Sequence, residues 1–263
     1  MSLITLTTDF GLSDWFVGTM KGVVLGIAPR ATIVDVTHDI PAGNVRSGAF
    51  VLRSAVPYFP KGSIHVVVVD PGVGTGRASL AVRMERSILI GPDNGVLTLA
   101  MESGRVKSVR RIENRALCLP EISRTFQGRD VFAPVAAHLS RGVSYDRVGP
   151  EVNEFIRLRL PDPMVEKGWI RGEVVYTDRF GNGITNLNWG RFKADERGGR
   201  ARVGRRRVVV GESYQSVPEG RAVLVPGSTG YWEVAVNGGN AAERLGLREG
   251  DRVQLGSGDE DAG

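Results

Sequence analysis

Apolar residues in the first 160 positions form short runs that alternate with segments of helical spacing. Strand-like runs occupy residues 3–7, 32–36 and 64–69. Between the first two runs, apolar side chains recur at helical spacing until Pro29. This alternation is typical of parallel strands joined by crossover helices, so it predicts a layered α/β domain over residues 1–160 with a mainly parallel central sheet.

Two further helices are predicted in the same region. The first runs from Asn44, whose side chain suits an N-cap, to Ala55. The second follows Asp130 and ends near Gly142. Pro134 lies inside this second helix, and it is tolerated there only within the first turn.

The pattern changes after Pro161-Asp162-Pro163, where short strands follow one another with almost no helix. The predicted strands lie at residues 170–176, 202–210, 221–225 and 232–236. We therefore expect a smaller, all-β, barrel-like domain over residues 164–256. The tail at 257–263 is acidic and consists of polar and small residues, and we expect it to be disordered.

Composition and charge narrow the class of protein. The 41% hydrophobic and 24% charged fractions are those of a globular protein. No apolar run reaches about 18 residues, so no membrane anchor is expected. The net charge of +5 raises the question of nucleic-acid binding, and residues 197–207 are the densest basic segment. We favour a solvated hairpin there, because the segment leads into three valines and lacks the interleaved aromatic residues of a single-strand binder.

The chain contains one cysteine, Cys118, which has no companion for an intramolecular disulfide or a zinc site. None of the three histidines lies in a nucleophile or metal-binding pattern. The sequence begins directly on a strand-like segment without the pattern of a secretory signal, so we expect a cytoplasmic protein.

Three aspartates follow or end apolar strands, where ligands bind in an open parallel sheet. They are Asp9, Asp35 and Asp70. Asp70 is the sharpest candidate because four consecutive valines precede it, and such a run indicates a central strand buried on both faces. We therefore expect the Asp70 carboxylate at the edge of the sheet, in a partly desolvated position.

A glycine-rich loop at residues 71–76 follows Asp70 and leads to Arg77, which is seven residues after Asp70. Glycines would let the backbone approach a ligand closely, but the loop has neither the Gly-Lys-Ser/Thr ending of a phosphate loop nor the dinucleotide spacing. Two interpretations remain open from these residues: a ligand site, or a tight turn in which Arg77 simply pairs with Asp70.

Three other polar clusters are candidate sites, at residues 125–130, 178–182 and 228–240. In the first, we favour a structural role for Arg129 and Asp130, with Asp130 capping the following helix and pairing with the arginine. The second combines a carboxylate, an aromatic ring and an amide within five residues. A single cluster of this kind is more often a turn with polar side chains than a binding site.

Together these motifs resemble the S-adenosylmethionine hydrolase family, also called S-adenosylmethionine hydroxide adenosyltransferases, which is related to the fluorinase and chlorinase. The matching stretches occur in family order along nearly the whole chain. They are Thr8-Asp9-Phe10-Gly11, Lys21-Gly22-Val23, Val34-Asp35-Val36-Thr37-His38, Val69-Asp70-Pro71-Gly72-Val73-Gly74-Thr75, Pro92-Asp93-Asn94-Gly95, Gly128-Arg129-Asp130-Val131-Phe132-Ala133-Pro134, Asp178-Arg179-Phe180-Gly181-Asn182 and Asn237-Gly238-Gly239-Asn240-Ala241.

The resemblance implies roles for residues that bind the substrate. Asp9 would hold the ribose hydroxyls, a task that suits a carboxylate. Asp178 and Ser228 would receive the methionine amine and carboxylate. Phe180 would stack on the adenine ring. The remaining substrate-binding candidates are Asn182 and Asn237, which would read the adenine edge, and Glu233 in the stretch that follows Ser228.

The resemblance also implies an Asp, Arg, His set that positions and deprotonates water. Asp70 and Arg77 match the first two members, whereas Gln127 stands where the family has histidine. Glutamine cannot exchange a proton near neutral pH. We therefore expect Asp70 to orient the water and accept its proton, Arg77 to fix that carboxylate, and Gln127 to contribute a hydrogen bond.

The resemblance implies hydrolysis of S-adenosylmethionine at the ribose C5′ carbon, giving adenosine and methionine, and we expect no cofactor and no metal. The resemblance also implies a homotrimer whose sites form between the first domain of one subunit and the β-domain of the next. Two alternatives remain. The first is halide transfer to the same carbon, which the negative charge of Asp70 disfavours. The second is a sensor that binds S-adenosylmethionine without turnover.

Overall fold

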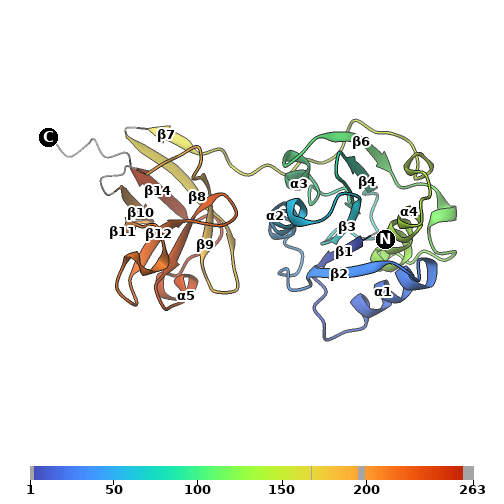
Figure 1. Ribbon diagram of the computed structural model, residues 1–263, viewed down its shortest axis with the longest axis horizontal. Helices are drawn as coiled ribbons and strands as arrows, with labels where there is room; N and C mark the ends of the chain where they lie inside the picture. Colours follow the sequence, from blue (N-terminus) through green and yellow to red (C-terminus); the bar gives the residue numbers. More distant parts are fainter. Residues whose placement is uncertain (1–2, 167, 195–198, 257–263) are drawn as a thin grey trace. The chain divides into compact units, whose positions relative to one another are not determined.

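The computed structural model describes residues 3–166, 168–194 and 199–256, and the chain divides into two units, Met1–Arg159 and Leu160–Gly263. The predicted tail at 257–263 lies outside the described residues. Each unit has its own hydrophobic core and its own sheet (Figure 1). The fold is mixed α/β, as the sequence predicted.

Unit 1 is built on a six-stranded sheet with the order β2-β1-β3-β5-β4-β6. Its strands are β1 (Leu3–Thr8), β2 (Thr32–Thr37), β3 (Ser63–Val68), β4 (Ser79–Met84), β5 (Ser87–Pro92) and β6 (Val106–Arg111). The strands β2, β1, β3 and β5 run parallel, and β4 runs antiparallel to both β5 and β6. The sheet is thus parallel except at one edge.

Helices cover the sheet of unit 1 on both faces (Figure 1). They are α1 (Phe16–Ile27), α2 (Val45–Ala55), α3 (Thr98–Glu102) and α4 (Ala133–Ser140), with 3₁₀ turns at Val56–Tyr58, Arg115–Leu117 and Tyr145–Arg147. The helices pack as two pairs, α1 with α4 and α2 with α3. Every residue of β3 is buried, as expected for a central strand between two helical layers.

The helices that the sequence predicted in unit 1 are present, with one change near Asp130. Asn44 caps α2 by accepting a hydrogen bond from the Ser47 amide at 2.9 Å. A π-helical turn at Gly128–Phe132 precedes α4, and Pro134 lies in the first turn of α4. Asp130 therefore does not cap this helix: α4 begins after Phe132, and no side chain caps it.

Unit 2 is a closed barrel. Its strands are β7 (Met164–Glu166), β8 (Trp169–Thr177), β9 (Gly183–Asn188), β10 (Arg200–Val203), β11 (Arg206–Val210), β12 (Ala222–Pro226), β13 (Tyr231–Val236) and β14 (Arg252–Gly256). The sheet order is β14-β10-β11-β12-β13-β9-β8-β7, and the additional pairing of β14 with β8 closes seven of these strands into a ring. The expectation of a barrel-like domain is confirmed.

The prediction of one strand over 202–210 was wrong. β10 and β11 form a hairpin there, with Gly204 in the left-handed region at φ 57°. A glycine adopts this conformation without a steric penalty, so the chain reverses inside the predicted strand. A short helix, α5 (Ala241–Leu245), and a 3₁₀ turn at Tyr214–Ser216 complete the unit.

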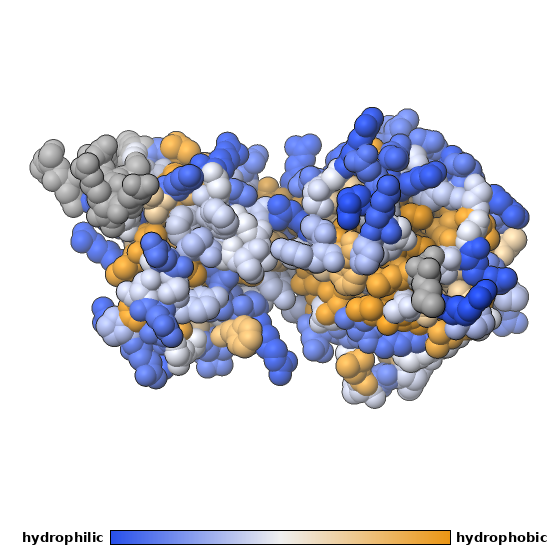
Figure 2. Space-filling view, viewed as in Figure 1, coloured by the Kyte–Doolittle hydropathy of each residue, from blue (hydrophilic) through white to orange (hydrophobic). Residues whose placement is uncertain are grey.

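Among the described residues, no helix is both long and apolar enough to cross a bilayer. The face of unit 1 seen in Figure 2 carries a broad apolar area bordered by hydrophilic side chains. Exposed apolar side chains of this unit include Leu12 and Trp15, which lie in the segment between β1 and α1.

Candidate functional site

Asp70 lies just beyond the carboxyl end of β3, where the sequence predicted it. The Asn94 side chain supports this end of the strand by donating a 2.8 Å hydrogen bond to the Val69 carbonyl. The loop after Asp70 then folds back, so that the Arg77 side chain lies beside the Asp70 carboxylate. Arg77 Nε donates to Asp70 Oδ1 at 2.9 Å, and Arg77 Nη2 pairs with Asp70 Oδ2.

The pairing of Asp70 with Arg77 is bidentate and almost fully buried. Their side chains are 5% and 8% exposed. The second terminal nitrogen, Arg77 Nη1, donates to the Ala78 carbonyl at 3.1 Å and to Ser79 Oγ at 3.0 Å. Charge-assisted contacts of this kind fix orientation as well as adding stability. The Asp70 carboxylate is therefore rigidly held.

Gln127 joins this pair from a distant part of the chain. Its Oε1 accepts a 2.6 Å hydrogen bond from Arg77 Nη2. The residue precedes the π-helical turn, and wide turns of this kind frequently occur at functional sites. The predicted trio of Asp70, Arg77 and Gln127 is thus in direct contact, with Arg77 as its centre.

A cavity of about 320 Å³, the Asp70 pocket, opens beside the trio. Its lining includes Asp9, Asp70 and Gln127. The structure therefore brings a predicted substrate-binding residue, Asp9, together with two predicted catalytic residues. Aromatic rings form one wall. Phe126 packs edge-on against Phe10 and Phe16, with ring centres 5.9 and 5.1 Å away. The pocket therefore combines two carboxylates with an apolar, aromatic surface.

Asp9 is held by a backbone contact. Its Oδ2 accepts a 2.8 Å hydrogen bond from the amide of Gly43, which has a left-handed φ of 70°. Gly43 also lines the pocket. Sequence reasoning missed this residue, and the only local signal was a glycine shortly before the N-cap of α2.

A polar network supports the turn that carries Asp9. Lys21 Nζ lies 2.5 Å from Asp35 Oδ2, and His38 Nε2 lies 3.0 Å from Asp35 Oδ1. On its other side, His38 Nδ1 is 2.8 Å from Thr8 Oγ1, which accepts a hydrogen bond from the Phe10 amide. Asp35 therefore lies in this supporting network and not in the lining of the Asp70 pocket.

In unit 2, Asp178 and Asn182 close the turn between β8 and β9. The Asn182 amide donates to Asp178 Oδ1 at 2.8 Å, and Asn182 Nδ2 donates to Asp178 Oδ2 at 3.0 Å. The side-chain nitrogen of Asn182 is thus engaged within the turn. Phe180, at the tip, is 76% exposed and presents its ring to solvent.

Glu233 is a second acidic group in unit 2 and is only 6% exposed. Its Oε1 accepts a 2.7 Å hydrogen bond from the Tyr214 hydroxyl. Burial raises the pKa of the Glu233 carboxyl, the Tyr214 hydrogen bond lowers it, and the negative charge of Asp178 raises it. Burial also raises the pKa of Tyr214 to about 12, with a further contribution from Glu233. These couplings place Asp178, Tyr214 and Glu233 in one electrostatic cluster.

The two remaining predicted residues lie in turns around β13. Ser228 is exposed in the turn between β12 and β13. Asn237 follows β13, and its Nδ2 donates a 2.7 Å hydrogen bond to the Val217 carbonyl. Substrate candidates in unit 2 thus come from the β8–β9 turn, the β12–β13 turn, β13 itself and the residue that follows it.

Asp130 forms the predicted pair with Arg129, although it does not cap a helix. Arg129 Nε donates to Asp130 Oδ1 at 2.6 Å, and the Ser123 amide donates to Asp130 Oδ2 at 2.8 Å. Burial raises the pKa of the Asp130 carboxyl, but these hydrogen bonds and the Arg129 charge lower it by more. The net shift is downward, so the buried carboxylate is held in its charged form.

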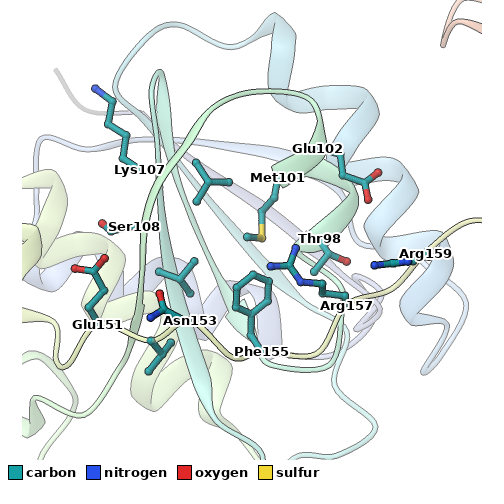
Figure 3. Close-up of a pocket in the computed structure, with 13 residues that line it drawn as sticks. Thr98, Met101, Glu102, Lys107, Ser108, Glu151, Asn153, Phe155, Arg157 and Arg159 are labelled. Atoms are coloured by element: carbon teal, nitrogen blue, oxygen red, sulfur yellow. The ribbon is translucent and has the colours of Figure 1, made fainter.

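A larger cavity of about 510 Å³ lies between α3, β6 and the segment 151–159 (Figure 3). The Arg157 guanidinium is stacked 4.3 Å from the centre of the Phe155 ring at this cavity. None of the predicted site residues lines it. Within the described residues, no group of three or more His, Cys, Asp or Glu side chains is placed to hold a metal ion.

Family models match both units of the chain. The N-terminal domain of SAM hydroxide adenosyltransferases matches residues 4–149, and the C-terminal domain of the same family matches residues 172–254. The chain belongs to the SAM hydroxide adenosyltransferase family. The family resemblance inferred from the sequence motifs is therefore confirmed.

Individual proteins are also similar to this chain, two of them along nearly their whole length. A Salinispora tropica protein named (R)-S-adenosyl-L-methionine hydrolase is 41% identical over 258 residues, which cover 97% of this chain and 98% of that protein. A crystal structure of an uncharacterized conserved protein from Thermotoga maritima aligns with a TM-score of 0.88 at 39% identity, covering 96% of this chain and 99% of that one. A fluorinase from Actinoplanes sp. is more distant, at 29% identity over 71% of this chain and 72% of that enzyme.

Proposed function

We propose that this chain hydrolyses S-adenosyl-L-methionine to adenosine and L-methionine. The observation that carries this proposal is the Asp70 carboxylate, which is buried, bound by both Nε and Nη2 of Arg77, and directed to a pocket that also contains Asp9. Relatives at about 40% identity along the full chain are named as hydrolases of this substrate, whereas the fluorinases are more distant.

The leaving group in this reaction needs no acid. Methionine departs from a sulfonium as a neutral thioether, so the protein needs only to align water with C5′ and accept one proton. We propose that Asp70 orients the water and takes its proton while Arg77 holds the carboxylate in place. Fixed orientation is worth about 7 to 11 kcal/mol in favourable cases.

Gln127 completes this arrangement by holding Arg77. Its Oε1 accepts from Arg77 Nη2, and its amide group can donate to the water but cannot take up a proton. In this proposal, therefore, the family's histidine is replaced by a residue that positions the catalytic groups, and Asp70 is the base.

We propose that unit 1 and unit 2 bind different parts of the substrate. Asp9, held by Gly43, would bind the ribose hydroxyls. Asp178 and the nearby Glu233 provide negative charge for the methionine ammonium, and Ser228 is an exposed donor for its carboxylate. Phe180, Asn182 and Asn237 would contact the adenine, with the exposed Phe180 ring as a stacking platform.

We further propose that the protein is a cytoplasmic homotrimer in which each site combines unit 1 of one subunit with unit 2 of another. The support is the resemblance to the family together with the division of the proposed substrate residues between the two units. Cys118 is a free thiol, which suits a reducing compartment.

Two other activities are distinguishable from hydrolysis. Halide transfer requires an anion to approach C5′ next to the Asp70 carboxylate, and the two negative charges repel each other. A sensor would bind S-adenosylmethionine without turning it over. Asp70 and Gln127 in the lining of the Asp70 pocket, with Arg77 bound to both, favour hydrolysis over these two activities.

The test is chromatography of the products formed by purified protein in chloride-containing buffer. Each sulfonium epimer is supplied separately, because the names of the relatives specify the R form. We expect adenosine and methionine, and a loss of about 100-fold or more in Asp70→Asn. Asp146→Asn, an exposed aspartate outside the pocket, is the matched control and should retain activity. A 5′-chlorinated nucleoside, or intact substrate despite binding, would overturn the proposal.

A further inference from the structure

A second cavity lies in unit 1 on the other side of the trio. This Cys118 pocket has a volume of about 490 Å³, and its lining includes Arg77, Arg111, Arg115, Cys118, Ile122 and Gln127. Asp70 and Asp9 line the Asp70 pocket and are not part of the lining of the Cys118 pocket. Gln127 is the one residue that lines both pockets.

The trio of Asp70, Arg77 and Gln127 forms the boundary between the two pockets. Arg77 lines the Cys118 pocket, while the carboxylate that it binds lines the Asp70 pocket. Gln127 Oε1 lies 2.6 Å from Arg77 Nη2, so the two side chains lie side by side in this boundary. A molecule that passes Gln127 from the Cys118 pocket therefore arrives next to Asp70.

The charge of the Cys118 pocket is unsuitable for the proposed substrate. Three arginines contribute to its lining. Arg77 is paired with Asp70 and Arg111 lies 3.4 Å from Glu113, so the excess positive charge of the lining is that of Arg115. S-adenosylmethionine carries a sulfonium and an ammonium against a single carboxylate, so a cationic lining repels it. Water carries no charge and is small enough to enter.

We propose that the nucleophilic water reaches Asp70 through the Cys118 pocket, and that the released proton leaves by the same path, while the substrate occupies the Asp70 pocket. This inference rests on the proposed hydrolase function. In the reaction, the C5′–S bond breaks with its electron pair going to sulfur, and a C5′–O bond forms. The water proton passes to Asp70 and then, past Gln127, to water in the Cys118 pocket.

A separate route has a physical advantage for this reaction. A bound substrate that fills the Asp70 pocket excludes solvent from that side, yet each turnover consumes one water molecule and produces one proton. A second opening lets both exchange without release of the substrate. The route also needs no ionisable group at position 127, because Asp70 is the group that takes up the proton.

Cys118 provides a way to close this route without mutation, because it is the only cysteine in the chain. The thiol is treated with methyl methanethiolsulfonate, which adds a methylthio group, or with the trimethylammonium-ethyl reagent, which adds a bulkier cation. Burial raises the pKa of the Cys118 thiol, so the reaction is run at about pH 9, where more thiolate is present. Mass spectrometry measures the extent of modification.

We expect the folded protein to be modified even with S-adenosylmethionine saturating the Asp70 pocket. The bulky adduct should lower kcat by about tenfold, and the small adduct by less, with less than about a twofold change in the binding constant for substrate. Dithiothreitol should restore kcat. The Cys118→Ser variant is the control, and its rate should not respond to either reagent.

Each other outcome overturns the inference. A fully modified protein with unchanged kcat shows that water does not use this path. Weaker substrate binding after modification, or protection of Cys118 by substrate, shows that the pocket belongs to the substrate side. A thiol that reacts only after denaturation shows that the pocket is closed to solvent. Absence of product from the unmodified protein overturns the proposed function itself, and the route with it.

Discussion

At the scale of single residues, the site is organised by what each polar side chain is bound to. Arg77 uses Nε and both terminal nitrogens on fixed acceptors, which leaves the Asp70 carboxylate little freedom to turn away from the pocket. Gln127 belongs to the trio because its side chain accepts a hydrogen bond from Arg77, and its role does not depend on taking up a proton. We therefore expect position 127 to tolerate another hydrogen-bonding residue.

We expect Gln127→His to be at least as active as the wild type. Histidine can bond to Arg77 or the water and can also accept a proton, and its ordinary pKa of about 6.5 lies in the range where the rate is measured. The rate of adenosine formation should therefore gain a pH dependence near neutrality that the wild type lacks. An inactive variant alongside an active wild type would contradict the positioning role of Gln127.

His65 is a buried residue whose titration affects stability. It lies on β3, where its Nδ1 is 2.8 Å from Thr5 Oγ1, and its Nε2 has no hydrogen-bond partner among the described residues. Burial lowers the pKa of His65 to about 4, from an ordinary value of 6.5. Between these two pH values the unfolded chain binds a proton that the folded protein does not, so the folded state loses stability as the pH falls.

The free energy of unfolding should therefore drop by up to about 3 kcal/mol between pH 6.5 and pH 4 because of this one group. Urea unfolding at several pH values measures the effect. His65→Asn should show a shallower decline over that window, since asparagine does not titrate. Equal slopes in the two proteins would exclude the histidine as the cause.

At the scale of elements, β3 determines where the chemistry occurs. It lies between β1 and β5, and its carboxyl end leads into Asp70. Close packing at the β3–β5 contact maintains this position. A Cβ atom added at Gly91 of β5 would lie 2.6 Å from the Val67 carbonyl oxygen, nearer than two such atoms can approach.

Gly91→Ala should destabilise the protein by about 1 to 3 kcal/mol, because the strand must shift to admit the methyl group. The matched control is Gly26→Ala in α1, where an added Cβ meets nothing within 4 Å. That variant should gain about 0.4 to 1 kcal/mol from the lower entropy of the unfolded chain. Thermal unfolding compares the two, and a Gly91→Ala protein as stable as the wild type would contradict the packing explanation.

At the scale of the whole molecule, the proposed substrate contacts are divided between the two units. Asp9 and the trio belong to unit 1, whereas Asp178, Phe180 and Glu233 belong to unit 2. This division makes the proposed trimer testable by mixing subunits, because each variant subunit retains one intact half of a site.

Co-expression of Asp70→Asn with Asp178→Asn should restore activity that neither variant has alone. In randomly mixed trimers, about one quarter of the sites combine an intact unit 1 with an intact unit 2 from another subunit, so about that fraction of wild-type activity is expected. Light scattering should give three times the 28.4 kDa chain mass. No recovery in mixed trimers would mean that each site is formed within one chain.

The sequence by itself determined the elements that have strong local signals. The apolar runs of β1, β2 and β3 are read directly from the chain, as is α2 with its Asn44 cap. It also placed Asp70 at the end of a central strand. It missed the antiparallel strands β4 and β6, because each carries arginine among its apolar residues and neither has the continuous apolar run of a buried strand. It also missed β5, β7, β9 and β14, whose apolar runs are three residues long or shorter.

Only the tertiary structure decided which distant groups meet. The contact between Arg77 and Gln127 joins residues 50 positions apart, and the one between Asp9 and Gly43 joins residues 34 positions apart. The β14–β8 pairing that closes the barrel is more remote still, with Arg252 opposite Glu173. Local patterns determine how a segment folds, whereas these contacts depend on strand order, register and the packing of side chains between elements.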